Sequence, residues 1–376
     1  MNKYNTQPGQ LLDEIKRPEF YKLAKDMNAD RYCKTFTAWD QFVVLSFAQL
    51  SGQHGLRSIE NALNSHYSSF YHLNIRKPVK HSTLSYADSH RDAAFFEALY
   101  YQTVERVSPF IRGAKKKEIY AIDATTISLC FTLFKWALFR NTKSGVKMHV
   151  KYDTEYGIPE FIAISNANKH ENSTLKDMKL KKGDTVTFDL GYVNYKQFHQ
   201  FCRNGIYFVT RLKDNAAYTV IADNPVPPTA GNIKSDELIL LTGDKAMHDC
   251  PEFLRKITST DHDTGKDITL LTDMKRKEDS AENISMIYRK RWQIELFFKA
   301  VKQNLRIERF YGNSENAVRT QVWISMIMYL LFLLLRIKTG CMNRNFTSFI
   351  SEIKLVKFLF LSTGIYMHGS LFIFLL

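Results

Sequence analysis

The sequence is poor in cysteine, and its few cysteines lie far apart. Five occur in 376 residues, none at the CxxC spacing of a zinc site: Cys33, Cys130, Cys202, Cys250 and Cys341. Neither a zinc centre nor a disulfide framework is predicted, and a reducing compartment fits this usage.

Secretory and membrane signals are also lacking. The first twenty residues contain no apolar segment of the kind that a signal peptide needs. The apolar run at residues 322–335 has 14 residues, fewer than the roughly 20 that span a bilayer, so it is predicted to be a buried helix. Residues 358–376 carry no Lys, Arg, Asp or Glu, but Ser, Thr, Gly and His interrupt them. No stable membrane association is expected.

Acidic residues are in the minority. The chain has 52 Lys and Arg against 38 Asp and Glu, a net charge of +14, while 45% hydrophobic and 13% aromatic residues suffice for folded cores. Such a surplus of positive charge favours a polyanionic partner. Nucleic acid is the leading candidate, ahead of an anionic membrane surface.

Apolar residues at helical spacing predict a helical domain at residues 1–112. Between its helices lies a basic stretch, residues 74–91, which either contacts DNA or is a solvated connector. Its cationic candidates are Arg76, Lys77, Lys80, His81 and Arg91.

From residue 113 the pattern changes to strands alternating with helices. Strands are predicted at residues 118–129, 145–153, 157–165, 184–192 and 206–212, with helices near 172 and at 195–202. Three strands, helix, strand, helix, strand is the element order of an RNase H-like core, an α/β mixed sheet with helices on both faces. A β-rich insertion is predicted at about 213–267. The strand 268–273 and a closing helix complete a domain at 113–312, and an apolar helical region follows at 313–376.

Three acidic residues follow this order of elements. Asp123 lies in the first core strand and Asp189 at the end of the fourth, so their carboxylates could converge, with Glu295 on the closing helix as the third. Oxygen ligands without nearby His or Cys select two Mg²⁺ (or Mn²⁺) ions, which suit in-line attack on a phosphodiester. Taken singly, Asp123 or Asp189 could equally be a turn former.

The closing helix carries a polar stripe. At 100° per residue, one arc contains Tyr288, Arg291, Glu295, Lys299 and Lys302. The opposite side is apolar and contains Ile294, Phe297, Phe298, Val301 and Leu305. The stripe either holds phosphates around one carboxylate or decorates a solvated surface.

Further DNA contacts are predicted beside this stripe. Trp292, at its edge, could stack on a flipped base or be buried against the insertion. Lys147, His149 and Lys151 alternate along a strand, where they could line a DNA channel or form an ordinary polar strand face.

The spacing Tyr288, Arg291, Glu295 and Lys302 resembles the signature of DDE transposases of the IS-four insertion-sequence family. The segments IDATTISL and TFDLGYVNY are similar to the two Asp motifs of that family. The resemblance implies a bacterial enzyme of the cytoplasm, associated with the nucleoid, for cut-and-paste transposition. Asp123, Asp189 and Glu295 would be its catalytic metal ligands.

Partners also follow from the resemblance. They are double-stranded DNA, as inverted-repeat ends and as target, and a second copy in a DNA-bound homodimer. Tyr288, Arg291 and Lys302 would hold phosphates, and Lys299 joins them by geometry alone. The last residues are more apolar than the polar tail expected of the family. A catalytically idle DNA-binding remnant with a disrupted C-terminus is therefore the alternative, and a stand-alone structure-specific nuclease is a third.

Overall fold

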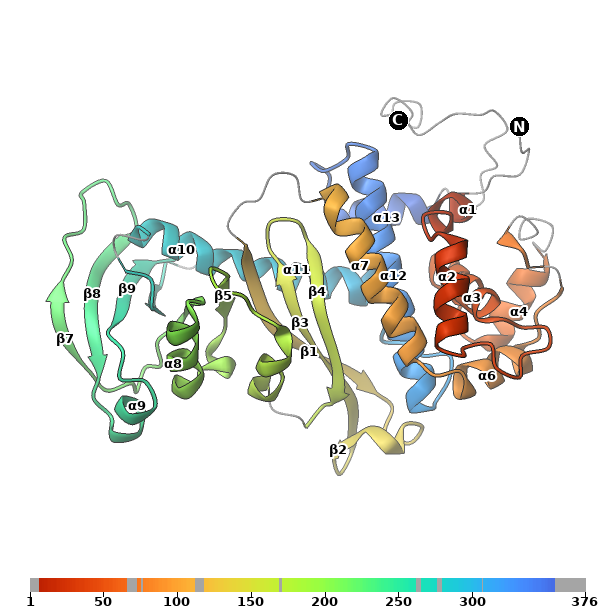
Figure 1. Ribbon diagram of the computed structural model, residues 1–376, viewed down its shortest axis with the longest axis horizontal. Coiled ribbons are helices and arrows are strands. Elements are labelled where there is room, and N and C mark those ends of the chain that lie inside the picture. Colours follow the sequence, from red (N-terminus) through yellow and green to blue (C-terminus); the bar gives the residue numbers. More distant parts are fainter. Residues whose placement is uncertain are drawn as a thin grey trace. The chain divides into compact units, whose positions relative to one another are not determined.

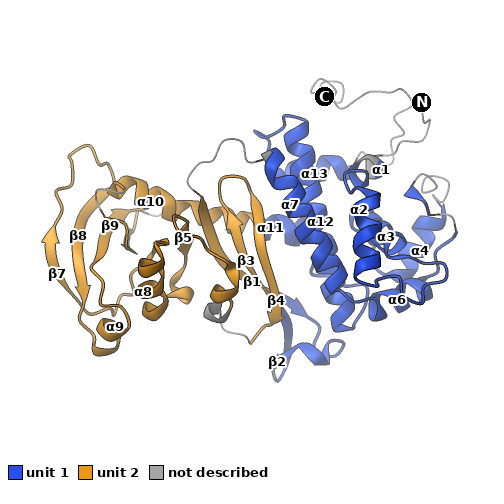
Figure 2. Ribbon diagram, in the orientation of Figure 1, with its two compact units in different colours: residues 1–113, 127–146, 298–376 blue, residues 114–126, 147–297 orange. Residues whose placement is uncertain are grey.

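The computed structural model describes residues 7–65, 73–75, 77–111, 118–168, 171–261, 265–275, 279–305 and 307–355 (Figure 1). The chain forms two compact units (Figure 2). Unit 1 comprises residues 1–113, 127–146 and 298–376, and unit 2 comprises residues 114–126 and 147–297. The domain boundaries expected from the sequence, after residues 112 and 312, stay a prediction.

Unit 1 is largely helical, and its central helix is α12. Its described helices are α1 (Gln7–Leu12), α2 (Arg17–Asp26), α3 (Ala38–Ser51), α4 (Leu56–Ser65), α6 (His81–His90), α7 (Ala94–Ile111), α12 (Glu315–Lys338) and α13 (Phe346–Leu355). Among the described helices, α12 alone is long and apolar enough to cross a membrane, and 83% of its apolar window is buried. The predicted buried helix at 322–335 is therefore confirmed. Residues 358–376 lie outside the described part.

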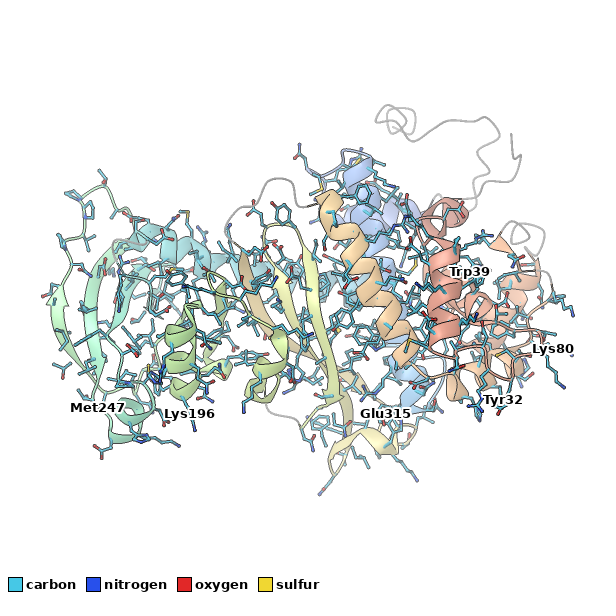
Figure 3. The ribbon with its side chains drawn as sticks, in the orientation of Figure 1. Tyr32, Trp39, Lys80, Lys196, Met247 and Glu315 are labelled. Atoms are coloured by element: carbon cyan, nitrogen blue, oxygen red, sulfur yellow. The ribbon has the colours of Figure 1, made fainter. Side chains whose placement is uncertain are left out.

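The basic stretch of unit 1 is only partly exposed. Lys80 and Lys77 lie on the surface, and Figure 3 labels Lys80 there. Arg91 is only 7% exposed, because its guanidinium donates to the Phe36 carbonyl (2.9 Å) and to the Gln41 side chain (2.5 Å). Of the two alternatives for this stretch, a DNA contact or a solvated connector, neither holds for Arg91, because its cation is used inside the fold. Arg76 lies outside the described residues.

One mixed sheet runs through the strand-rich part of the chain. Its strands are β1 (Ile119–Leu129), β2 (Leu138–Arg140), β3 (Lys143–Asp153), β4 (Ile158–Asn166), β5 (Thr185–Phe188), β6 (Tyr207–Arg211), β7 (Tyr218–Asp223), β8 (Ile233–Leu241), β9 (Leu254–Thr260) and β10 (Asp267–Thr272). They lie in the order β2-β3-β1-β5-β6-β10-β9-β8-β7, and β4 pairs with β3. Strands β1, β5 and β6 are parallel to one another. The predicted adjacency of the two Asp-bearing strands is thereby confirmed.

Helices cover both faces of this sheet in unit 2. Residues 120, 122, 186, 188 and 208 pack on one face with α8 (Tyr195–Asn204). Residues 209 and 270 pack on the other face with α10 (Ala281–Lys290). This alternation along each strand follows from the two-residue period of a strand. The predicted mixed α/β sheet with helices on both faces is confirmed.

The segment predicted as a β-rich insertion extends the same sheet. Strands β7, β8 and β9 and the short helix α9 (Asp244–Asp249) lie within it. β9 pairs antiparallel with β10, which in turn pairs antiparallel with β6. Arg255 on β9 and Asp236 on β8 form a buried ion pair, with 2.7 Å from Nε to Oδ1 and 2.6 Å from Nη2 to Oδ2.

Candidate active site

Three polar residues form a row across the parallel strands. The β1–β5 register pairs Ile122 with Phe188, and the residue after each one is an acid: Asp123 within β1 and Asp189 immediately after the end of β5. The β5–β6 register pairs Thr187 with Val209, and two positions further it places Arg211 beside Asp189. Strand pairing therefore brings two carboxylates and a guanidinium to neighbouring positions.

All three residues of this row lie on the face that α10 covers. Ile122 and Phe188 pack on the opposite, α8 face, so the residue after each one is directed to the α10 face. Val209 packs on the α10 face, and Arg211 two residues later shares it. The Thr210 hydroxyl donates to the Phe188 carbonyl (3.1 Å), which ties β6 to the end of β5 immediately before Asp189.

The helix that faces this row is interrupted at Arg291. Ser280 caps the N-terminus of α10 by accepting from the Asn283 amide, and α11 follows as Trp292–Asn304. At the junction the Arg291 amide donates to the Tyr288 carbonyl (3.1 Å), a bond that spans three residues instead of four. The single continuous helix expected from the sequence is therefore wrong at this one residue, where a tighter turn intervenes. The predicted apolar face of the helix is buried as expected.

Arg291 joins the strand acids to the helix acid. Its Nη2 lies 2.7 Å from Glu295 Oε1, and its Nη1 lies 3.9 Å from Asp123 Oδ2. The Arg291 and Asp123 side chains are less than one-fifth exposed, and that of Glu295 is about one-third exposed. Glu295 also lies in the first turn of α11, where a helix favours negative charge.

The pKa of Tyr288 reflects the burial and the charges of the same site. Burial raises the pKa of Tyr288 and nearby Asp189 adds to the effect, while Arg291 and Arg211 oppose it. Burial acts to lower the Arg291 pKa, but Tyr288, Glu295 and Asp123 outweigh it, so the pKa lies above its ordinary value. Arg291 therefore stays charged between the acids.

The two aspartates make local hydrogen bonds as well. Asp123 lies inside β1 and its Oδ1 accepts from the Ala124 amide (2.7 Å), so it is not the turn residue considered as an alternative. Asp189 does form a turn, because its Oδ1 accepts from the Gly191 amide (2.9 Å). A carboxylate offers about four lone-pair sites, so this cap leaves capacity for a further ligand.

The other predicted site residues differ in exposure. Trp292 is 56% exposed, so the alternative of burial against the insertion does not hold in this structure. Lys299 is exposed and Lys302 half-buried on α11, and Lys147 is half-buried on β3. Their roles stay predictions.

Lys151 is a correction to the expected DNA channel. Its side chain is 8% exposed, its Nζ lies 2.9 Å from Glu160 Oε2, and it lies 4.4 Å from the centre of the Tyr120 ring. His149 is fully buried, with its Nε2 3.0 Å from the Ser165 hydroxyl. This part of β3 is covered on both faces, so His149 and Lys151 line an interior rather than a surface.

Sequence reasoning missed Arg211. The residue stands near the end of the segment IYFVTRL, which was read only as a core strand. The available signal was a cation at the end of β6, the predicted strand that follows the Asp189 strand along the chain. Its significance depends on the β5–β6 register, which the sequence does not specify.

The chemistry of the acidic residues suits a hard divalent cation. Asp123, Asp189 and Glu295 offer only oxygen, the donor that Mg²⁺ and Mn²⁺ prefer. Within the described ranges, no three His, Cys, Asp or Glu side chains are gathered closely enough to hold one ion. The Arg291 guanidinium does lie against two of the three acids, which shows that positive charge fits between them.

Asp123 and Asp189, which follow paired positions of neighbouring parallel strands, are thus faced by Arg291 and Tyr288 from the covering helix. Residues 114–331 match the model of the transposase DDE domain, more than half of the chain. The chain therefore belongs to the family of transposases with a DDE domain. Residues 4–76 match a second model, described as a domain of unknown function (DUF4372).

Relatives that bear the names of transposases resemble the chain over most of its length. One from Sinorhizobium fredii (y4zB) is 32% identical over 66% of this chain and 69% of its own. One from Geobacillus stearothermophilus, named for insertion sequence element IS5377, is 24% identical over 94% and 91%. One from Synechocystis, named for element IS4SA, is 29% identical over 81% and 86%.

A solved structure was also matched, that of the piggyBac transposase synaptic complex with hairpin DNA. The likeness covers 93% of this chain and 80% of the other, at 10% identity and a TM-score of 0.45. At this level it carries no argument about the present chain.

Proposed function

We propose that this chain is the transposase of an IS-four-like insertion sequence and that it cuts and joins DNA at the inverted-repeat ends. The observation that carries the proposal is the row of Asp123, Asp189 and Arg211 on one sheet face, with Arg291 between Asp123 and Glu295. In this proposal the sheet of unit 2 is an RNase H-like core.

Asp123, Asp189 and Glu295 would hold Mg²⁺ or Mn²⁺ in this site. The bound ions would activate water or a 3′-hydroxyl and stabilise the leaving oxygen. Arg291 and Arg211 would bind phosphate oxygens with forked hydrogen bonds, because a planar guanidinium fits two oxygens at once. Tyr288 would add a hydroxyl contact and Lys302 a point charge. Trp292, more than half exposed, would stack on an unpaired base.

The proposed partners follow from this role. They are double-stranded DNA, both as the element's ends and as the target, and a second copy of the chain when DNA is bound. Such a protein would work in the bacterial cytoplasm, at the nucleoid.

The test is nicking of a duplex that ends in the inverted repeat flanking the gene, with Mg²⁺ present. Asp123→Asn, Asp189→Asn and Glu295→Gln should each lower the nicking rate on the order of a thousandfold, the effect of losing several kcal/mol of metal assistance. Asp214→Asn, at an exposed acid outside the row, is the matched control. All variants should still bind the duplex in a gel shift.

Two outcomes would contradict the proposal in different ways. If the wild-type chain binds the repeat but never nicks it, the chain is the idle DNA-binding remnant. If Asp123→Asn or Glu295→Gln nicks at the wild-type rate, the assignment of the metal ligands is wrong.

A further inference from the structure

The loop between β1 and β2 exposes an unusual number of large apolar side chains. Phe131 is 45% exposed and Leu133 56%, both within residues 130–137, which we call the β1–β2 loop, and Leu138 at the start of β2 is 43% exposed. Single exposed apolar residues are common on protein surfaces, whereas a group of them marks an interaction site. The group therefore needs a partner.

The fold holds this loop in place. Phe134 is 6% exposed and its ring centre lies 6.2 Å from that of Phe310, while Ala137 is fully buried. The Trp136 indole donates to the Asn313 carbonyl (2.8 Å). The second half of the loop is thus anchored, while Phe131 and Leu133 remain exposed. A loop that is already ordered loses little entropy when it binds.

The chain segment that contains the loop carries charge of one sign. Residues 124–152 contain no Asp or Glu, although acids make up about one residue in ten of the whole chain. Within the same segment lie five cations: Lys135, Arg140, Lys143, Lys147 and Lys151. Of these, Lys135 and Lys143 are exposed, beside the outward apolar side chains. Apolar side chains with cations beside them along the chain complement stacked bases flanked by phosphates.

We propose that the β1–β2 loop is a wedge that enters duplex DNA. Phe131 and Leu133 separate one base step and cover the exposed base faces, while Lys135 and Lys143 hold the phosphates on either side. Proteins that kink DNA insert apolar side chains in this way and regain the cost of unstacking through added contacts. The inference rests on the proposed function only in that DNA is the substrate, and it gives this loop a role separate from the acidic site.

The test uses duplexes with 2-aminopurine at successive positions across the inverted-repeat end, because its fluorescence rises when its neighbours unstack. The wild-type chain should raise the signal severalfold at one base step. Phe131→Ser with Leu133→Ser should abolish that rise and weaken binding about ten- to hundredfold, the range that base-stacking contacts give. The matched control is Met247→Ser with Phe253→Ser, both 49% exposed in the segment before β9, with Met247 labelled in Figure 3. The control should keep both the signal and the affinity.

The lysines give an independent measurement. Lys135→Ala with Lys143→Ala should reduce the slope of log affinity against log salt by about 1.8, since each phosphate contact contributes about 0.9. The same 2-aminopurine rise on an unrelated duplex of equal length would support a wedge that serves any DNA, including the target.

Two results would overturn the wedge. The first is a serine double variant that keeps the 2-aminopurine rise; if that variant also changes the mass measured by light scattering without DNA, the loop serves contacts between copies instead. The second is a wild-type chain that binds and nicks the repeat without any rise, which leaves the proposed function intact. If the wild-type chain binds no repeat duplex at all, the proposed function fails together with the wedge.

Discussion

Arg291 lies 2.7 Å from Glu295 and 3.9 Å from Asp123, so a single guanidinium contacts two of the three candidate metal ligands. A divalent ion entering between these acids would meet a positive charge already there. The same arginine is also the best-placed donor for a phosphate. Both metal binding and DNA binding would therefore depend on where the Arg291 side chain lies.

Removing this cation should make the acids more available to metal. We expect Arg291→Gln to bind Mn²⁺ about two- to fivefold more tightly without DNA, because a partly exposed ion pair contributes only about 0.5–1 kcal/mol. The same variant should bind DNA more weakly. Titration calorimetry with Mn²⁺ gives the first quantity and a gel shift the second. Arg289→Gln, on the exposed side of α10, is the control, and equal Mn²⁺ affinity in all three proteins would rule out the competition.

Arg211 should act on DNA and not on metal. Its register position beside Asp189 places its guanidinium next to the acids, and a guanidinium is not a metal ligand. Arg211→Ala is expected to lower the salt slope of DNA binding by about 0.9 while leaving Mn²⁺ affinity within twofold. Lys213→Ala, at an exposed cation two residues later, is the comparison. A variant that loses Mn²⁺ binding instead would show that Arg211 supports the acids structurally.

The buried Arg255–Asp236 pair predicts a large stability effect. Both side chains are less than 5% exposed and joined by two hydrogen bonds. Arg255→Leu should cost about 3–5 kcal/mol of unfolding free energy, because it leaves a buried carboxylate without its partner. Adding Asp236→Leu should recover part of that loss. Urea unfolding measures both. A single variant within about 1 kcal/mol of wild type would mean that water reaches the remaining carboxylate.

Asp88 predicts a pH dependence in unit 1. Burial raises the pKa of Asp88 to about 7, although its hydrogen bond from Gln41 and the nearby Arg91 oppose this. The folded state therefore holds a proton that the unfolded state releases near pH 4. Between about pH 4 and 7 this group should lower the stability as the pH rises, by about 1.4 kcal/mol per pH unit.

Asp88→Asn removes the titrating group and keeps an oxygen that can accept from Gln41. The difference in unfolding free energy between the variant and wild type should change along this slope, and should level off above about pH 7. Urea unfolding at half-unit pH steps measures it. Parallel pH profiles for the two proteins would show that Asp88 is ionised in the folded state throughout.

The adjacency of the two Asp-bearing strands and the buried face of the closing helix could be predicted from the sequence. Asp123 and Asp189 were placed on adjacent strands because the order of strands and helices permits few topologies. Ile294, Phe297 and Val301 were assigned to a buried face because helical spacing is a local property. Both inferences required only neighbours along the chain or the order of elements.

Residue pairings that depend on register could not be predicted in the same way. Arg211 lies beside Asp189 only through the alignment of two strands that α8 separates along the chain. The tighter turn at Arg291 changes the direction of a few side chains without interrupting the apolar pattern, so the sequence carries no sign of it. The Lys151–Glu160 pair is different, because it follows from a local hairpin. Strand β3 ends at Asp153 and β4 begins at Ile158, and Lys151 and Glu160 each lie two residues from the turn between them. The sequence thus contained a clue to that pair, which the alternation of polar residues concealed.

The strands that follow β6 add to the same sheet through β10, whose Leu270 is paired with Arg211 on β6. Residues from these strands, among them Ile239 and Leu254, share one hydrophobic core with Phe198 and Phe208. The segment from β7 to β9 is therefore an integral part of the sheet and its core, and not an independently mobile insertion. Continuous hydrogen bonds connect β7 to β9, through β10 and β6, with the strands that carry the acids. A force applied to β7 to β9 would therefore displace these strands together with the candidate site and not independently of it.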